Sequence, residues 1–367
     1  MIVKANERKK HFRTVSFNKA KNHVVLIEQR LLPHEFKLLE TKDFQETAHA
    51  ITDMVVRGAG AIGATAAYGL AQGIRAYKGR SVEEIGKKAA IIGKTLKEAR
   101  PTAVDPINAV NWMLKSLSAE KTVSSYKNKA LALAHQFADE DVEHCQQLGA
   151  HGNRVIKSGM RILTHCNAGW LAFVDFGSAT APIYTARDAG KSVHVFCDET
   201  RPRCQGASLT AWELAQEGIS HDVIPDNAAG HLMQRGEIDM VITGADRVLG
   251  KTGEVTNKIG TYTKAILAAK HNIPFYVAIP LSTIDWNLDD GMKIPIEERG
   301  EEETLGAWGI NKTGKRTYVR IANETSSGRN PAFDVTPADL VTGIITPKGI
   351  LKPTSLWKKR RSLGWPT

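Results

Sequence analysis

The chain has 367 residues, of which 42% are hydrophobic and 24% charged, and its formal net charge is +10. This length predicts two domains with sizeable cores, and the composition is typical of soluble globular proteins. No apolar stretch approaches the roughly 18 residues of a membrane-spanning helix. Residues 1–13 lack the apolar region of a secretory signal. We therefore expect a cytoplasmic protein that does not interact with membranes.

Much of the positive charge lies at the two ends of the chain, in residues 8–10 and 358–361. We interpret these runs as solvated tails and expect no nucleic-acid partner, because an anionic small substrate explains a positive field equally well. The chain has no CxxC spacing, which argues against a zinc module and a disulfide framework. Each of its four cysteines is then either a core residue or a chemically active one: Cys145, Cys166, Cys197 and Cys204.

The first part of the chain predicts short strands followed by helices. The strand candidates are 24–29 and 36–41, and the helical stretches are 64–77, 82–99, 110–117 and 127–148. Gly149 is expected to end the last helix, because glycine commonly terminates helices. We therefore predict a smaller, mainly helical domain with a few short strands over residues 1–149.

The second part repeats a short apolar, β-branched run followed by a helix-like stretch. The runs are 161–167, 193–202, 221–227, 239–246 and 275–283. This alternation predicts an α/β fold, with a Rossmann-like parallel sheet in a domain over residues 150–367. Residues 286–330 are polar and weakly patterned, and residues 330–353 predict a capped helix and a short strand.

Ligands of open parallel sheets bind outside the carboxyl ends of the strands. Those ends gather a thiol, several carboxylates and an arginine, which is the layout of an active site. The residues concerned are His165, Cys166, Asn167, Asp198, Glu199, Arg201, Asp226, Asp246 and Ser282.

Residues 58–63 match the dinucleotide fingerprint G-x-G-x-x-G. The fingerprint requires a strand before it, whereas residues 45–57 are typical of a helix, so we expect no nucleotide cofactor. Arg57 beside a glycine-rich turn that opens a helix would suit a phosphate. A tight turn with a surface arginine explains the segment as well.

Cys166 lies at a strand end before a helix-like start, where a thiol can act as a base or nucleophile. Asp246 ends an apolar strand, where a partly desolvated carboxylate can act as a general acid. The alternatives are a buried structural cysteine for Cys166, and an N-cap or a structural partner for Arg247 for Asp246. Cys145, on the long helix, is interpreted as core.

Two further segments complete the candidate site. In residues 197–214 we interpret the charged residues Asp198, Glu199 and Arg201 as support, and Gln205 as a ligand contact at the start of a helix. Asn257 and Lys258, before another helix, predict a cradle for a phosphate or a sugar hydroxyl.

Taken together, the chain resembles the 5-methylthioribose-1-phosphate isomerase family, which is homologous to the alpha, beta and delta regulatory subunits of eukaryotic initiation factor 2B. The resemblance runs from about residue 24 to 353. Its motifs are RGAGAIG (57–63), THCNAGWLA (164–172), CDETRPRCQGASLTAWEL (197–214), ITGADRV (242–248), NKIGTYTKA (257–265) and NPAFDVTP (330–337).

The resemblance implies an aldose–ketose isomerase of methionine salvage that acts on a phosphorylated pentose without a metal or organic cofactor, and a homodimer. It implies Cys166 and Asp246 as the catalytic pair. It implies substrate contacts from Arg57, Gly58, Ala59, Arg100, Gln205, Asn257 and Lys258.

Three features depart from the family pattern: Gly60 replaces a proline, Arg203-Cys204 replaces apolar residues, and residues 326–329 are unfamiliar. The 5-substituent of the substrate therefore stays open, with 5-deoxyribose 1-phosphate and ribose 1,5-bisphosphate as alternatives. A bisphosphate would need an extra cationic subsite, for which Arg203 and Arg329 are the candidates. A non-catalytic regulatory subunit is the alternative from another class, although a scaffold has no need of both Cys166 and Asp246.

Overall fold

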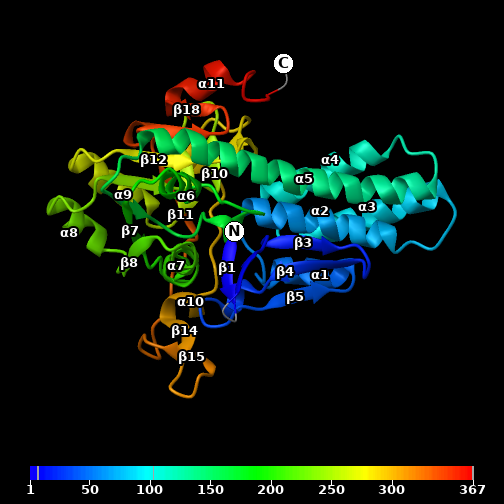
Figure 1. The fold of residues 1–367 in the computed structure, drawn as a ribbon, viewed down its shortest axis with the longest axis horizontal. Coiled ribbons are helices and arrows are strands. Elements are labelled where there is room, and N and C mark those ends of the chain that lie inside the picture. Colours follow the sequence, from blue (N-terminus) through cyan, green and yellow to red (C-terminus); the bar gives the residue numbers. More distant parts are fainter. Residues whose placement is uncertain (6–7, 102, 366–367) are drawn as a thin grey trace. The chain divides into compact units, whose positions relative to one another are not determined.

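The computed structural model describes residues 1–5, 8–101 and 103–365 (Figure 1). The chain forms two compact units, unit 1 with Met1–Gln146 and Ala168–Ala181, and unit 2 with Gln147–Asn167 and Pro182–Thr367. The predicted domains 1–149 and 150–367 stay a prediction. Among the described residues, no helix combines the length and apolar character needed to cross a bilayer.

Unit 1 contains short strands and a set of long helices. Its strands are β1 (Ile2–Ala5), β2 (Arg8–His11), β3 (Val15–Asn18), β4 (His23–Ile27) and β5 (Leu38–Thr41). Its helices are α1 (Phe44–Thr52), α2 (Ala59–Arg75), α3 (Val82–Glu98), α4 (Val104–Leu117) and α5 (Val123–Gly152), the last of which continues into unit 2. The predicted strands β4 and β5 and the four predicted helices are confirmed, whereas β1, β2 and β3 were not predicted.

The prediction that Gly149 ends the long helix is wrong, because α5 continues to Gly152. A glycine inside a helix costs only about 1 kcal/mol, so tertiary packing can override it. Other helix ends follow local signals. Asp43 caps α1 by accepting a hydrogen bond from the Glu46 N–H, and Ser81 caps α3 in the same way through the Glu84 N–H.

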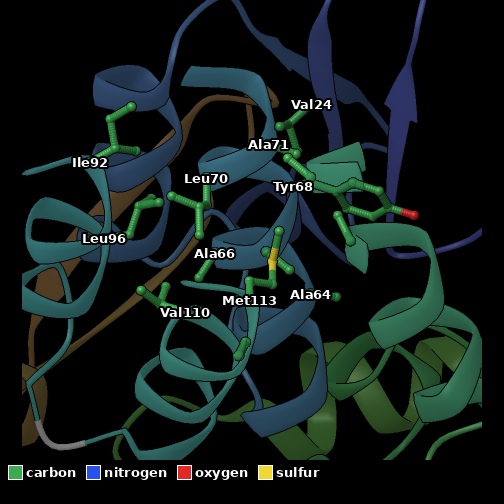
Figure 2. Close-up of a cluster of buried hydrophobic side chains, with 14 of the residues drawn as sticks. Val24, Ala64, Ala66, Tyr68, Leu70, Ala71, Ile92, Leu96, Val110 and Met113 are labelled. Carbon is green, nitrogen blue, oxygen red and sulfur yellow. The ribbon is translucent and has the colours of Figure 1, made fainter. Parts of the chain in front are cut away.

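Small residues on α2 allow the neighbouring helices to pack closely against it. A Cβ atom on Gly69 would lie 2.9 Å from Thr47 Cγ2, and one on Gly73 would lie 2.7 Å from Ile92 Cδ1. The core between α2, α3, α4 and β4 is shown in Figure 2, where Leu70, Leu96 and Val110 point toward one another. Unit 1 thus has its own hydrophobic core.

Unit 2 is built on a seven-stranded sheet. In spatial order the strands are β18 (Gly349–Leu351), β17 (Gly343–Thr346), β12 (Phe275–Ala278), β9 (Met240–Thr243), β6 (Met160–Thr164), β7 (Val193–Asp198) and β8 (Ser220–Ile224). All neighbouring pairs are parallel except β17 with β18. All five predicted runs form strands of this sheet, which confirms the predicted α/β fold.

The helices that follow these strands are α6 (Ala181–Asp188), α7 (Ala211–Glu217), α8 (Ala228–Gln234) and α9 (Thr261–Lys270). The first three parallel strands run β6, β7, β8 outward in one direction, and the chain then returns to place β9, β12 and β17 on the other side of β6. The strand order therefore reverses between β6 and β9. In open α/β sheets, such a reversal point is where ligands bind.

A second sheet has the order β13 (Ile284–Asp285), β10 (Arg247–Leu249), β11 (Val255–Lys258) and β16 (Phe333–Thr336). The weakly patterned stretch 286–330 contains the short helix α10 (Glu302–Leu305) and a hairpin of β14 (Gly306–Ile310) and β15 (Arg316–Arg320). The prediction for residues 330–353 is wrong in detail: the helix there is a single 3₁₀ turn, and three strands form instead of one. The last helix is α11 (Leu356–Lys359).

Candidate active site

Cys166 lies two residues beyond the end of β6 and is held through both of its peptide groups. Its N–H donates to the Thr200 hydroxyl at 2.8 Å, and its carbonyl accepts from the Thr210 hydroxyl at 2.7 Å. Its φ is +64°, in the left-handed region that only a few per cent of non-glycine residues occupy. The side chain is 8% exposed. The fold thus orients a nearly buried thiol at the carboxyl edge of the sheet.

The structure brings Gln205 directly to this thiol. Cys166 Sγ lies 3.4 Å from Gln205 Oε1, close enough for the S–H to donate to the amide oxygen. Gln205 immediately precedes a π-helical turn, Gly206–Thr210, that leads into α7. Single π turns occur frequently at functional sites. A Cβ atom at Gly206 would lie 1.8 Å from the Asp198 carbonyl oxygen, so only glycine allows this approach.

A buried charged cluster lies next to Cys166. His165 Nδ1 is 2.8 Å from Asp198 Oδ2, and the Lys264 ammonium is 3.2 Å from the same oxygen. Asp198 is fully buried and the other two side chains are 1–4% exposed. Buried charges require partners of opposite sign, and here one carboxylate joins β6, β7 and α9. Asp198 therefore forms buried ion pairs with its neighbours, and its supporting role toward the site stays a prediction.

The other predicted supporting residues lie in the loop after β7. Arg201 donates from its guanidinium to the carbonyls of Glu303 and Gly306, at 2.9 and 2.8 Å. Its N–H and that of Thr200 both donate to the Asp226 carboxylate at 2.7 Å. Glu199 continues the chain at the edge of the sheet, where its N–H donates to the Ile224 carbonyl.

Asn257 and Lys258 end β11, beside this cluster. His165 Nε2 lies 2.8 Å from the carbonyl oxygen of Ile259, the next residue along the chain. Asn257 donates from its amide to the Thr261 hydroxyl at 3.0 Å, and the Lys258 ammonium donates to the Ala332 carbonyl at 2.8 Å. Both side chains are buried, at 6% and 7% exposure.

Asp334 occupies the N–H groups at the start of α9. It accepts from the Gly260 N–H at 2.7 Å and from the Tyr262 N–H at 3.1 Å. Burial raises the pKa of Asp334, and these two backbone hydrogen bonds oppose the rise. Since a carboxylate already fills this helix start, the Asn257–Lys258 segment suits a sugar hydroxyl better than a phosphate.

His165, Asp198 and Asp226 also come close enough to be considered as metal ligands, with their donor atoms within 4.8 Å of one another. An ammonium already lies at the Asp198 carboxylate, and Asp226 accepts two backbone N–H groups. A divalent cation there would have to displace or repel these partners. The donor set of this cluster therefore does not fit a metal.

Asp246 follows β9, the strand that neighbours β6 on the other side of the reversal point. Its N–H donates to the Thr256 carbonyl at 2.9 Å, which fixes it beside β11. Its side chain is exposed, so the partial desolvation expected from the sequence is not observed. Arg247 pairs with Asp285 at 3.0 Å, so this arginine has another carboxylate partner.

The remaining predicted contacts, Arg57, Gly58, Ala59 and Arg100, belong to unit 1. Gly58 caps α2 with a φ of +93°, and a Cβ atom there would lie 2.4 Å from Ala172 Cα. Both facts require glycine. The helix α1 precedes this turn, as expected from the sequence, whereas a dinucleotide site would need a strand there. Arg100 lies two residues beyond the end of α3 and is half-buried.

The other cysteines differ from Cys166 in their surroundings. Cys145 and Cys197 are fully buried, and burial raises the pKa of each thiol, that of Cys145 well above its ordinary value. The interpretation of Cys145 as a core residue is confirmed. Cys204 is half-buried and its pKa is raised by burial, with Arg201 opposing the rise.

Three residues of this region were missed by the reasoning from sequence: Thr200, Lys264 and Asp334. Lys264 is a charged residue on the buried side of α9, and a lysine at an otherwise apolar helix position is a signal that could have drawn attention to it. Thr200 and Asp334 carry no such local signal, since their importance comes from hydrogen bonds to distant segments.

Comparison with known proteins places the chain in a family. Residues 55–353 match the model of the initiation factor 2 subunit family. Methylthioribose-1-phosphate isomerase of Brucella anthropi is 48% identical over 366 residues, covering 96% of this chain and 97% of the relative.

Two solved structures extend the comparison. The crystal structure of 5-methylthioribose 1-phosphate isomerase from Pyrococcus horikoshii has a TM-score of 0.87 and 41% identity, covering 96% of both chains. That of the translation initiation factor eIF-2B subunit delta from A. fulgidus has a TM-score of 0.84 and 36% identity, covering 97% of this chain and all of that one. The chain therefore belongs to the initiation factor 2 subunit family and, within it, to the family of the methylthioribose-1-phosphate isomerases.

Proposed function

We propose that this protein converts 5-methylthioribose 1-phosphate into 5-methylthioribulose 1-phosphate, a step of methionine salvage. The observation that carries the proposal is the position of Cys166 and Asp246. They follow β6 and β9, the two neighbouring strands between which the strand order reverses. A purely regulatory subunit has no use for a thiol and a carboxylate at this point.

The chemistry requires ring opening and then a hydrogen shift. Phosphate on C1 blocks the spontaneous ring opening that free sugars undergo. Asp246 would therefore protonate the ring oxygen as the bond between C1 and the ring oxygen breaks. One hydrogen then moves from C2 to C1, and the C2 hydroxyl loses the proton that balances the one gained by the ring oxygen. C1 is reduced while C2 is oxidised, which makes the enzyme an intramolecular oxidoreductase that needs no external electron acceptor.

Cys166 would serve the transfer between C2 and C1. It acts either as a shuttle that removes a proton from C2 and returns it to C1, or by stabilising the transition state of a hydride shift. Gln205, whose amide can accept from a thiol or donate to a thiolate, supports either role. Isomerisation in D₂O separates the routes, because a shuttled proton exchanges with solvent whereas a shifted hydride keeps the hydrogen of C2.

The substrate contacts outside this pair are proposed from the resemblance. Asn257 and Lys258 would bind sugar hydroxyls. The carboxylate of Asp334 nearby favours hydroxyl groups here, because it would repel an anionic group such as a phosphate. Arg57, Gly58, Ala59 and Arg100 would complete the contacts to the phosphorylated pentose. Fixing the reacting groups in this way can contribute several kcal/mol to barrier lowering.

Two arginines that could have formed a second phosphate subsite already have carboxylate partners. Arg203 pairs with Glu303 at 2.5 Å, and Arg329 pairs with Glu298 at 3.3 Å with its side chain 89% exposed. A phosphate at either arginine would have to compete with a carboxylate already there, which counts against a second phosphate subsite and favours the methylthio sugar over ribose 1,5-bisphosphate. 5-Deoxyribose 1-phosphate, which carries an uncharged methyl group at C5, is not disfavoured by this argument.

We further propose that the enzyme is a homodimer, as the family resemblance implies. Sedimentation equilibrium at micromolar concentration tests this directly. The expected mass is twice the 40.1 kDa of one chain, and a mass of 40.1 kDa throughout the concentration range would contradict the proposal.

The activity is tested by ³¹P and ¹H NMR of purified protein with 5-methylthioribose 1-phosphate. We expect turnover to the ketose 1-phosphate that is lost in C166S and D246N. Matched controls are C204S, which changes a half-buried cysteine, and D222N, which changes an exposed carboxylate paired with His194. Both should retain turnover.

Turnover that persists in C166S or D246N would remove that residue from the mechanism. Turnover with 5-deoxyribose 1-phosphate or ribose 1,5-bisphosphate alone would reassign the substrate. Absence of turnover with all three sugars would favour the alternative of a non-catalytic regulatory subunit.

A further inference from the structure

Three residues around the candidate thiol have a left-handed backbone without being glycine. The φ angles are +64° at Cys166, +62° at Thr200 and +53° at Cys204. For a β-branched residue such as threonine this conformation is a genuine outlier, because the branched Cβ crowds the backbone. Residues held in such conformations persist only where the surrounding structure enforces them, and they cluster at functional sites.

Thr200 is held by its main chain on both sides. Its N–H donates to Asp226 Oδ1 at 2.7 Å, and its carbonyl accepts from the Cys204 N–H at 2.8 Å. The residue is 2% exposed. These contacts fix the loop between β7 and the π-helical turn, and they would exist with any side chain at position 200.

The hydroxyl of Thr200, by contrast, has a specific use. Oγ1 accepts the Cys166 N–H at 2.8 Å and donates to the Asp198 carbonyl at 3.0 Å. It thereby connects Cys166, two residues beyond β6, to the end of β7. Glycine or asparagine would adopt this φ more readily, but glycine has no group that could accept the Cys166 N–H.

We propose that Thr200 is a positioning residue for the isomerase reaction, whose hydroxyl holds Cys166 in its left-handed conformation and so aims the thiol. Thr210 holds the carbonyl of Cys166 from the opposite side, so both peptide groups of this residue are tied to threonine hydroxyls. The inference rests on the proposed function of Cys166. Beyond that function, it explains why a β-branched residue occupies a left-handed conformation at position 200: the hydroxyl of Thr200 is needed to hold Cys166.

The test compares T200S, T200A and T200G. T200S keeps the hydroxyl and T200A removes it. Neither serine nor alanine is β-branched, so these two variants differ only in the hydroxyl. T200G also removes the hydroxyl, and because glycine adopts a positive φ freely, T200G takes the place of T200A if T200A does not fold. We expect T200S to keep the kcat of the parent. We expect T200A and T200G to lose roughly 100-fold in kcat with KM nearly unchanged, the effect of misplacing a reacting group by about 1 Å.

A second readout is the rate at which iodoacetamide alkylates each cysteine, followed by peptide mass spectrometry. Cys166 should change its rate in T200A and T200G and keep it in T200S. A general collapse of the loop would also change Cys204, whose N–H bonds to the Thr200 carbonyl. We expect the rate at Cys204 to be unchanged.

The inference is overturned if T200A and T200G keep the parent kcat, if T200S loses as much as they do, or if Cys204 changes together with Cys166. Absence of turnover in the parent protein is a different result, since it contradicts the proposed function. The alkylation rates of Cys166 then still decide whether the hydroxyl positions the thiol.

Discussion

Asp141, on α5, is a buried carboxyl group in unit 1 whose titration should dominate the pH dependence of that unit. Its Oδ2 accepts the Val174 N–H at 2.7 Å, and its Oδ1 lies 2.2 Å from where a Cβ of Gly60 would be. Burial is the largest cause that raises its pKa to about 7, from an ordinary 3.8. The negative charges of Asp105 and Asp175 raise it further, while the Val174 N–H and Arg13 oppose them.

The sign of the effect follows from proton binding. Between pH 3.8 and about 7 the unfolded chain has released the Asp141 proton and the folded chain still holds it. The stabilisation by the protonated carboxyl is therefore complete below pH 3.8 and is lost as the pH rises through about 7. The difference between a pKa of 3.8 in the unfolded chain and about 7 in the folded chain corresponds to about 4 kcal/mol of unfolding free energy.

D141N tests this reasoning, because asparagine has the same shape and can still accept from the Val174 N–H. We expect D141N to match the parent near pH 4 and to exceed it at pH 8 by up to about 4 kcal/mol. At 2–4 °C per kcal/mol for a unit of this size, the difference in the unfolding midpoint is roughly 10 °C. Calorimetric scans from pH 4 to 8 measure it.

The matched control is D139N, which removes the same charge from an exposed position. Asp139 is 61% exposed and pairs with Arg13 at 2.7 Å, so its loss should cost no more than about 1 kcal/mol at any of these pH values. The reasoning is refuted if the parent and D141N show the same pH dependence of the midpoint between pH 5 and 8.

Further predictions concern the charged cluster and the glycine turn. K264M should destabilise unit 2 by roughly 3–5 kcal/mol in thermal unfolding, because it leaves the fully buried Asp198 carboxylate with His165 as its remaining ion-pair partner. The control R161M breaks a half-exposed ion pair with Asp239 and should cost about 1 kcal/mol. Equal losses of stability in the two variants would contradict the importance of burial. G58A should lower the free energy of unfolding several times more than G190A. Both glycines have a positive φ, but only at Gly58 would the added Cβ lie within 2.5 Å of backbone atoms. Denaturant unfolding measures both losses, and similar values would show that the close contact with Ala172 relaxes.

Local patterns account for the parts of the fold that the sequence predicted. The runs 161–167 and 239–246 are apolar and β-branched over the length of a strand, and β6 and β9 formed there. The hairpin β14–β15 was missed because its residues alternate poorly and much of it is exposed, including Trp308 and Val319. A hairpin with weak alternation gives no period-2 signal for burial.

At position 60 the resemblance to the family implies a proline, whereas this chain has Gly60. In the structure, a Cβ atom at this position would lie 2.2 Å from Asp141 Oδ1 and 2.7 Å from Phe173 Cδ1. The buried carboxyl of Asp141 thus occupies the space that a larger residue would need. Sequence alone showed the substitution, and only the packing showed what accompanies it.

The sequence by itself determined five strands of the large sheet and that reactive side chains follow them, because apolar periodicity acts over a few neighbouring residues. It thereby located Cys166, Gln205 and Asp246 at strand or helix boundaries. Only the tertiary structure decided which of these ends become neighbours, because strand order depends on crossovers that carry no local pattern. For the same reason only the tertiary structure shows two further contacts, the buried ion pair of Lys264 with Asp198 and the hydrogen bond from the Cys166 N–H to the Thr200 hydroxyl. Each contact joins segments that are far apart in the chain and that the sheet brings together.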